Sequence, residues 1–204
     1  MPNYSMPTDP VGSYNPCWMT NLYGASWSSN WNTCIYGSPT QVGADVLCNC
    51  TGYAQGRMLQ IYMELNPGYD PAALQDHAFS MFNVDAENWL TVAQNNGFTI
   101  LTQPAEGTVL VTGNPGITTG HVAVVERYDP DDGWLISESG YDTLPPFNLH
   151  YSLYESGGQW YSSYASDPLV RGFIQIPGAG PGPFPGSGYD RHHGHRARRD
   201  RLIL

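Results

Sequence analysis

Three residues of this chain, Cys50, His121 and Glu138, have the types that catalysis by a thiol nucleophile requires. A reactive cysteine needs a lowered pKa, which the unpaired N–H groups and positive dipole end in the first turn of a helix provide. A histidine then serves as the base, and a third polar group orients its ring. Taken singly, such a cysteine is more often a buried apolar residue and such a histidine a structural one, so only the combination predicts catalysis.

The helix that positions Cys50 is predicted over residues 50–65. Apolar residues recur there at spacings of one, three and four until Asn66-Pro67-Gly68 ends the pattern. Cys50 therefore lies in the first turn of this helix. A short helix is expected after Pro71, and a second good helix is predicted over residues 86–96.

The strands that position His121 and Glu138 follow the helices. Runs with strand-like period predict strands over residues 108–112, 121–126, 134–138, 149–154 and 170–176. A hairpin turn at residues 129–133 brings His121, which opens one strand, near position 141 and so close to Glu138 at the end of the next. The acidic residues of this turn lack the ligand spacing of a calcium loop, so a plain turn is predicted. Helices followed by an antiparallel sheet indicate an α+β fold.

Composition and charge exclude several function classes. The 204 residues suit one domain, and 23 Gly with 17 Pro predict many turns and loops. The formal net charge is −10, and five of the eight Arg lie after residue 177, so the body of the chain is acidic and should repel nucleic acid. Because all basic residues are Arg, no lysine nucleophile, Schiff base or phosphate-loop lysine is available.

The two ends of the chain differ from its middle. Residues 1–44 mix aromatics with Gly, Ser, Asn and Pro, and are predicted to form an irregular N-terminal arm. Residues 178–204 are predicted to form a Gly/Pro-rich linker and a basic C-terminal tail. Residues 45–177 remain as the predicted catalytic domain. The first residues have no basic n-region or apolar run, so neither a secretory signal nor a membrane helix is expected.

The other cysteines and histidines have competing interpretations. Cys17 and Cys34 either form a disulfide or stay free as buried thiols. The histidines of residues 192–195 would bind a transition metal weakly, and a solvated tail is the preferred interpretation. His77 and His150 have no carboxylate nearby in a predicted hairpin. We therefore predict no metal and no cofactor.

Four stretches of the chain match one known family in order and spacing. They are residues 49–57 (NCTGYAQGR), Trp89 with Ala93 and Gly97, residues 105–111 with 120–126, and residues 136–139 with 171–177. The first resembles a nucleophile motif and the third a central hairpin with its histidine. Together they resemble the CHAP domain (cysteine, histidine-dependent amidohydrolase/peptidase) of papain-like cell-wall hydrolases. The resemblance covers roughly residues 45–177.

This resemblance implies a papain-like fold, with N-terminal helices packed on an antiparallel sheet of about five or six strands. It also implies that the substrate is bacterial peptidoglycan. Cys50 is expected to attack an amide carbonyl, His121 to take and return the proton, and Glu138 to orient the imidazole.

Further site residues follow from the same resemblance. The backbone N–H of Cys50 is expected to donate to the oxyanion, because it lies at the helix N-terminus. Asn49, Tyr53 and Gly120 are the other predicted oxyanion or substrate-binding residues. For Asn49, a helix cap is the preferred role and a second oxyanion donor the alternative.

The chain departs from the family pattern at two points. Many relatives have Asn two positions after the glutamate, where this chain has Gly140, and Ser139 or Asp142 is the expected substitute. Some relatives bind calcium through acidic residues just before the cysteine. Residues 38–47 offer only Asp45 there, so no calcium is predicted.

The leading hypothesis from the sequence is a peptidoglycan hydrolase. It is either an N-acetylmuramoyl-L-alanine amidase or an endopeptidase, and both remain open. A bacteriophage endolysin or virion-associated lysin is expected, located in the phage virion (tail) or in the host cytoplasm before release to the cell wall. Peptidoglycan is the expected partner, with phage tail or other virion proteins bound through the C-terminal tail, and no nucleic acid or membrane. The alternative hypothesis is a structural or adhesive phage virion protein with a papain-like fold and little or no turnover.

Overall fold

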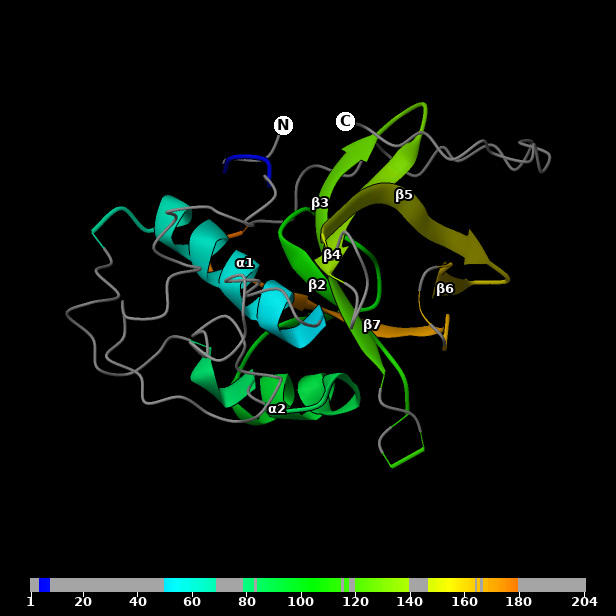
Figure 1. The fold of residues 1–204 in the computed structure, drawn as a ribbon, viewed down its shortest axis with the longest axis horizontal. Helices are drawn as coiled ribbons and strands as arrows, with labels where there is room; N and C mark the ends of the chain where they lie inside the picture. The colour runs from blue at the N-terminus through cyan, green and yellow to red at the C-terminus, as the bar shows by residue number, and fades with distance from the viewer. Residues whose placement is uncertain are drawn as a thin grey trace.

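The computed structural model describes residues 4–7, 50–68, 79–82, 84–114, 116–117, 120–139, 147–163, 165 and 167–179. Its helices come before its strands along the chain, as Figure 1 shows. Within these ranges, no helix has both the length and the apolar character that crossing a membrane requires. The short helix predicted after Pro71 lies outside the described residues.

In the described part of the chain, the two α-helices lie where the apolar spacing predicts them. α1 spans Cys50–Leu65, the same residues as the first predicted helix. The second predicted helix divides into a 3-10 turn, η4 (Ala86–Asn88), and α2 (Trp89–Asn95), and another 3-10 turn, η3 (Ser80–Phe82), precedes them. α2 ends before Gly97, whose φ of 77° is the left-handed conformation that terminates many helices.

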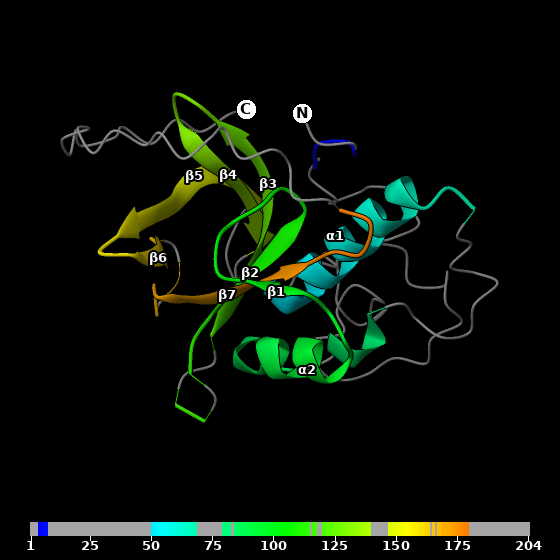
Figure 2. The same cartoon turned by 180° about the vertical axis from the view of Figure 1, so that it is seen from behind.

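Among the residues that the structure describes, the sheet contains seven strands, and each pairs with its neighbours in the antiparallel sense (Figure 2). The strands are β1 (Ile100–Leu101), β2 (Thr108–Thr112), β3 (His121–Asp129), β4 (Gly133–Ser139), β5 (Phe147–Ser156), β6 (Gln159–Ser162) and β7 (Val170–Gln175). Their order in the sheet is β1-β7-β2-β3-β4-β5-β6. The α+β prediction is confirmed, and all five predicted strands are present. The additional strands, β1 and β6, have two and four residues, which is too short to give a clear alternation.

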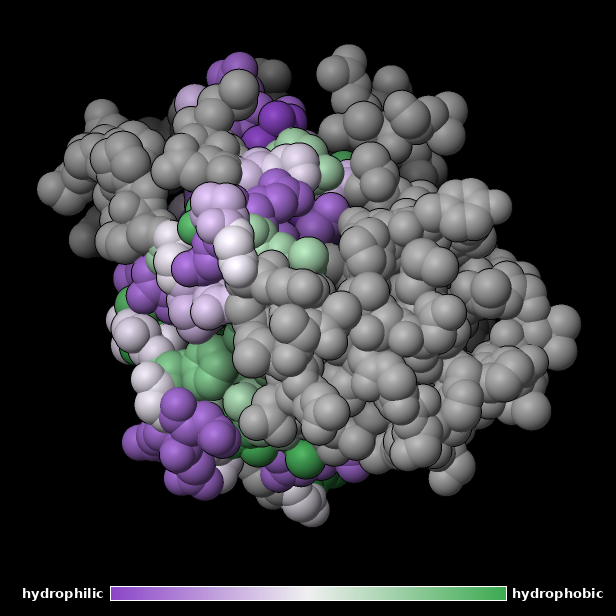
Figure 3. All heavy atoms as spheres, turned by 90° about the vertical axis from the view of Figure 1, so that its left-hand side faces the viewer, coloured by the Kyte–Doolittle hydropathy of each residue, from purple (hydrophilic) through white to green (hydrophobic). Residues whose placement is uncertain are grey.

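Both helices pack against the same face of the sheet (Figures 1 and 2). Successive residues of β2 and β3 belong alternately to two apolar clusters, as strand geometry requires. Val122 and Val124 lie in the cluster under α1 and α2, whereas Ala123 and Val125 lie in the cluster on the other face. Viewed from the helix side, the described surface mixes hydrophilic and hydrophobic residues (Figure 3). α1 and α2 therefore form a layer on one face of the sheet.

The hairpin of β3 and β4 contains a β-bulge at Glu126. Next to the turn, Asp129 pairs with Gly133 and Tyr128 with Trp134, whereas beyond the bulge Val125 pairs with Ile136 and Val124 with Ser137. Glu126 is the extra residue on β3. A shift of one residue exchanges the two faces of a strand pair. Without the bulge, Glu138 and His121 would project from opposite faces; with it, they share one.

The turn of this hairpin has the predicted plain form. The carboxylate of Asp129 accepts backbone hydrogen bonds from Asp131 at 2.9 Å and Asp132 at 3.3 Å, which is the pattern of an aspartate that closes a turn. The strand pairing starts directly at Asp129 and Gly133. The carboxylate of Asp129 thus stabilises the turn.

Candidate active site

Cys50 is the first residue of α1, and its thiol is free and partly buried. A side-chain hydrogen bond joins the thiol to His121, and the backbone N–H of Val122 also donates to the sulfur. Both contacts come from the start of β3, which lies against the N-terminal end of α1. The sequence therefore places the thiol correctly at a helix start, and the sheet supplies its partners.

His121 and Glu138 form the second contact of the site. Nε2 of His121 lies 2.5 Å from Oε2 of Glu138. Since Nε2 is engaged by the carboxylate, Nδ1 is the ring nitrogen left to face the sulfur of Cys50. The order is thus thiol, imidazole, carboxylate, with each pair in hydrogen-bond contact. The three residues that the sequence selected are brought together.

The electrostatics of the three groups favour a thiolate–imidazolium pair. Burial opposes ionisation of Cys50, but the charge and hydrogen bond of His121 outweigh it and hold the pKa of the thiol below its ordinary value. Burial likewise opposes the charge of His121, but Cys50 and Glu138 together raise the pKa of its ring to about 10. A thiol and an imidazole shifted in opposite directions are the arrangement that a cysteine nucleophile needs.

The carboxylate of Glu138 is nearly buried and remains charged. Burial raises its pKa, but hydrogen bonds from His121 and His150 and the charges of both rings lower the pKa of Glu138 to about 2. Its side chain is 4% exposed. A charge in so enclosed a position is stable only because hydrogen-bond donors surround it.

His150 is a residue of the site that the sequence analysis missed. Its Nε2 lies 2.8 Å from Oε1 of Glu138, a carboxylate that no predicted hairpin brought near His150. The contact arises because β5 pairs with β4, with Asn148 opposite Glu138 and His150 opposite Ile136. His150 is therefore a diagonal neighbour of Glu138 on the same face. Only the prediction of a strand near residues 149–154 pointed toward it, because no short turn fixes the register of β5 against β4.

A buried ion pair ties together the elements that carry the three residues. Arg57 of α1 donates to Glu126 through Nε and Nη2, both at 2.9 Å, and neither side chain is exposed. Ser137, directly before Glu138 on β4, donates its hydroxyl to the same carboxylate at 2.5 Å. Glu126 thus connects the helix of Cys50, the strand of His121 and the strand of Glu138.

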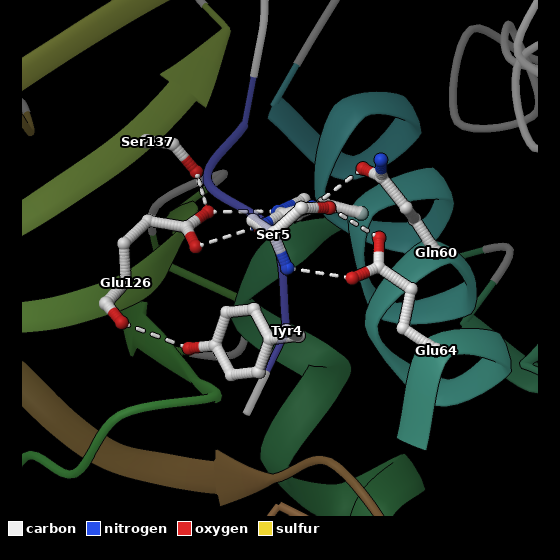
Figure 4. Close-up of polar contacts among 7 residues, drawn as sticks. Tyr4, Ser5, Gln60, Glu64, Glu126 and Ser137 are labelled. Atoms are coloured by element: carbon white, nitrogen blue, oxygen red, sulfur yellow. Dashed lines mark hydrogen bonds and ion pairs between the residues drawn. The ribbon is translucent and has the colours of Figure 1, made fainter. Parts of the chain in front are cut away.

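An N-terminal segment, Tyr4–Pro7, covers this ion pair (Figure 4). The hydroxyl of Tyr4 donates to the backbone carbonyl of Glu126 at 2.8 Å, and its ring lies 5.5 Å from the guanidinium of Arg57. The carbonyl of Ser5 accepts a hydrogen bond from Arg57, and Ser5 also donates to the carboxylate of Glu64 on α1 through its N–H and its hydroxyl. Residues at the start of the chain therefore help to fix α1 against β3.

The remaining predicted site residues have different surroundings. Tyr53 lies on α1 and is fully buried in the apolar core, beside Ser137, rather than on an open surface. Gly120 has φ of 66°, and a Cβ there would lie 2.6 Å from the carbonyl oxygen of Thr112. Gly120 thus permits a close backbone approach directly before His121. Asn49 lies outside the described residues.

Several further predictions also fall outside the part of the chain that the structure describes. These are the other cysteines, the histidines at 77 and 192–195, Gly140 and Asp142. Ser139 is buried at the end of β4. Among the described residues, no group of three or more His, Cys, Asp or Glu side chains is placed to hold a metal ion.

Comparison with known proteins agrees with the motifs. Residues 40–140 match the family model of the CHAP domain, a span that contains Cys50, His121 and Glu138. The probable autolysin SsaALP of Staphylococcus aureus (strain NCTC 8325 / PS 47) is 36% identical over 83 residues, which are 41% of this chain and 30% of that protein. A solved N-acetylmuramoyl-L-alanine amidase from Staphylococcus aureus is 24% identical with a TM-score of 0.38, and the match covers 63% of this chain and 31% of the amidase. The chain thus spans about a third of each of these two proteins.

Proposed function

This chain carries a CHAP domain over residues 40–140, and we propose that it is a hydrolase that uses Cys50 to cleave an amide bond of bacterial peptidoglycan. The observation that carries the proposal is the contact series from Cys50 through His121 to Glu138. The substrate class is supported by the family match and by the similarity to a probable autolysin.

The geometry supports a two-step acyl transfer. The thiolate of Cys50 attacks the carbonyl carbon of the amide, and the electron pair of the C=O bond moves to the oxygen. When the intermediate collapses, the C–N bond breaks and His121 gives its proton to the leaving amine. His121 then takes a proton from water, and the water oxygen attacks the thioester carbon. The C–S bond breaks, which releases the thiol group of Cys50 and forms the carboxylic acid.

Two groups stabilise the charges that develop during these steps. In this proposal the backbone N–H of Cys50 donates to the oxyanion, which is supported by the position of Cys50 at the N-terminus of α1. Glu138 holds the ring of His121 in one orientation and stabilises its positive charge. Tyr53 is buried, so its contribution is to pack α1 rather than to bind substrate in this conformation.

Two bonds of peptidoglycan are candidates for cleavage. An amidase would separate the glycan from the peptide at the muramoyl–alanine bond, whereas an endopeptidase would cut within the stem or cross-bridge peptide. The bacteriophage setting remains a prediction from the sequence.

Digestion of purified peptidoglycan tests the proposal. Sacculi from several Gram-positive species are incubated with the wild type, with Cys50→Ala and with Cys48→Ala, and the released fragments are identified by mass spectrometry. Cys48, two positions before Cys50 in the sequence, is the control cysteine, for which we expect a packing role only. We expect fragments from the wild type and from Cys48→Ala, and none from Cys50→Ala. A new muramoyl end identifies an amidase, and a new amino-acid end within the peptide identifies an endopeptidase.

The melting temperatures of all three proteins accompany this assay. Loss of activity in Cys50→Ala at an unchanged melting temperature assigns a chemical role to the thiol. If folded wild type releases nothing from any wall, the hydrolase proposal is wrong. Sedimentation of such an inactive protein with the sacculi would then favour the structural or adhesive alternative.

A further inference from the structure

We propose that His150 is a positioning residue of this active site, which holds the carboxylate of Glu138 in the orientation that His121 requires. The inference rests on the proposed function, because it assigns a role within the same catalytic series. Its basis is the sharing of one buried carboxylate by two histidines, each of which takes a different oxygen.

Each oxygen of the Glu138 carboxylate contacts a different histidine. Oε2 of Glu138 lies 2.5 Å from Nε2 of His121, and Oε1 lies 2.8 Å from Nε2 of His150. The side chains of His121 and His150 are 15% and 11% exposed, against 4% for Glu138. The carboxylate is therefore enclosed more tightly than either ring, and solvent does not readily replace a lost donor.

A carboxylate held through one oxygen alone is poorly defined. It rotates about its last bond, and its second oxygen is left as a buried acceptor without a donor, which is unfavourable. A donor on Oε1 removes both problems, because the plane of the carboxylate is then fixed at two points. Oε2 stays directed at His121, and the ring of His121 stays directed at Cys50.

The strand of His150 is itself well anchored against that of Glu138. β5 pairs with β4 over Trp134 to Ser139, and on the same strand Leu153 is buried in the apolar cluster on the face away from the helices. His150 therefore approaches Glu138 from a rigid element. His150 can therefore maintain the geometry of Glu138 without contacting the substrate itself.

Three variants test this role. His150→Ala removes the donor, His150→Gln replaces it with an amide N–H, and Leu153→Ala loosens β5 without touching Glu138. For each, the melting temperature is measured together with kcat and KM on solubilised peptidoglycan. The rate at which iodoacetamide alkylates Cys50 at pH 7 is measured as well. All four cysteines precede Arg57, the first Arg, and therefore lie in one tryptic peptide. Fragmentation of this peptide in the mass spectrometer shows which cysteine carries the label, and Cys50→Ala provides the blank.

We expect His150→Ala to lower kcat by about 10- to 100-fold with little change in KM. Alkylation of Cys50 should slow in parallel, since a less well held Glu138 stabilises the imidazolium less. His150→Gln should recover most of both rates. Leu153→Ala should lower the melting temperature at least as much as His150→Ala while kcat stays near the wild-type value.

Two results would overturn the inference. One is a His150→Ala protein with wild-type kcat and alkylation rate. The other is an equal loss of kcat in Leu153→Ala, because His150 would then act only by stabilising β5. The alkylation assay needs no cell-wall substrate. Slower alkylation in His150→Ala, found together with no digestion by the wild type, would retain the positioning role and reject the proposed function.

Discussion

The guanidinium of Arg57 meets the carboxylate of Glu126 through two hydrogen bonds of 2.9 Å, with both side chains fully buried. Glu126 is also the bulge residue of the β3–β4 hairpin. The same ion pair therefore joins α1 to the sheet and occupies the point where the strand register shifts. That shift places Glu138 on the face of His121, so the ion pair and the site geometry are coupled.

Replacement of Glu126 by Gln should destabilise the protein strongly. The substitution leaves Arg57 buried without its counter-charge, which typically costs about 3–5 kcal/mol in unfolding free energy. Urea denaturation of Glu126→Gln and of the double variant Arg57→Met/Glu126→Leu measures this cost. We expect the double variant, which buries no charge at this point, to be the more stable of the two. A Glu126→Gln protein within about 1 kcal/mol of the wild type would contradict the expectation.

Gly120→Ala should impair both stability and activity. A Cβ at Gly120 would lie 2.6 Å from the carbonyl oxygen of Thr112 and 2.8 Å from the backbone nitrogen of Glu87, so the chain before His121 must move. A displacement of about 1 Å at a catalytic group can reduce the rate by about 100-fold.

Gly116→Ala is the matched control for this substitution. Gly116 has φ of 75° and nothing within 4 Å of its would-be Cβ, so only the left-handed backbone penalty of about 1–2 kcal/mol applies. Peptidoglycan digestion and thermal melting compare the two variants. Equal losses in both would show that close packing at Gly120 does not position His121.

The contribution of Glu138 to stability should disappear in acid. Its pKa is lowered from 4.5 to about 2 in the folded protein, so its stabilising effect is complete above pH 4.5 and is lost as the pH falls through about 2. The shift corresponds to roughly 3 kcal/mol at neutral pH. The stability difference between the wild type and Glu138→Gln, taken from urea midpoints at pH 6, 4 and 3, should therefore shrink as the pH falls. A difference that is constant across this range would argue against a charged, hydrogen-bonded Glu138.

The reactivity of Cys50 should follow the thiolate–imidazolium pair. Because the pKa of Cys50 lies below its ordinary value of 9.0, iodoacetamide should label it at half the maximal rate at a pH below 9. In His121→Ala the thiol loses the charge and the hydrogen bond of the imidazole, while burial and the charge of Glu138 still oppose its ionisation, so the pKa of Cys50 should rise and the midpoint should move to higher pH. Hydrolysis by the wild type should also decline as the pH rises past about 10, where His121 loses its proton. An unchanged labelling midpoint in His121→Ala would mean that the imidazole does not activate this thiol.

Elements whose signals are local were predictable from the sequence. The apolar spacing and the Asn66-Pro67-Gly68 stop defined α1, which places Cys50 at a helix start. The strand patterns, with a turn at residues 129–133, predicted the hairpin that brings His121 close to Glu138. These features depend on residues within a few positions of each other, so a single sequence is sufficient to predict them.

The contacts between distant segments that complete the site depend on long-range packing. Glu126, the bulge residue, pairs with Arg57, which lies 69 positions earlier, and no local pattern reveals that pairing. The register of β5 against β4 brings His150 to Glu138, but the sequence between those strands has no signal that fixes this register in advance. These contacts also shift the pKa values of Glu138 and Cys50. Both groups are largely shielded from water, so neighbouring charges and hydrogen bonds act on them strongly. Composition and spacing thus identified the reacting groups, and long-range packing set their faces, partners and charges.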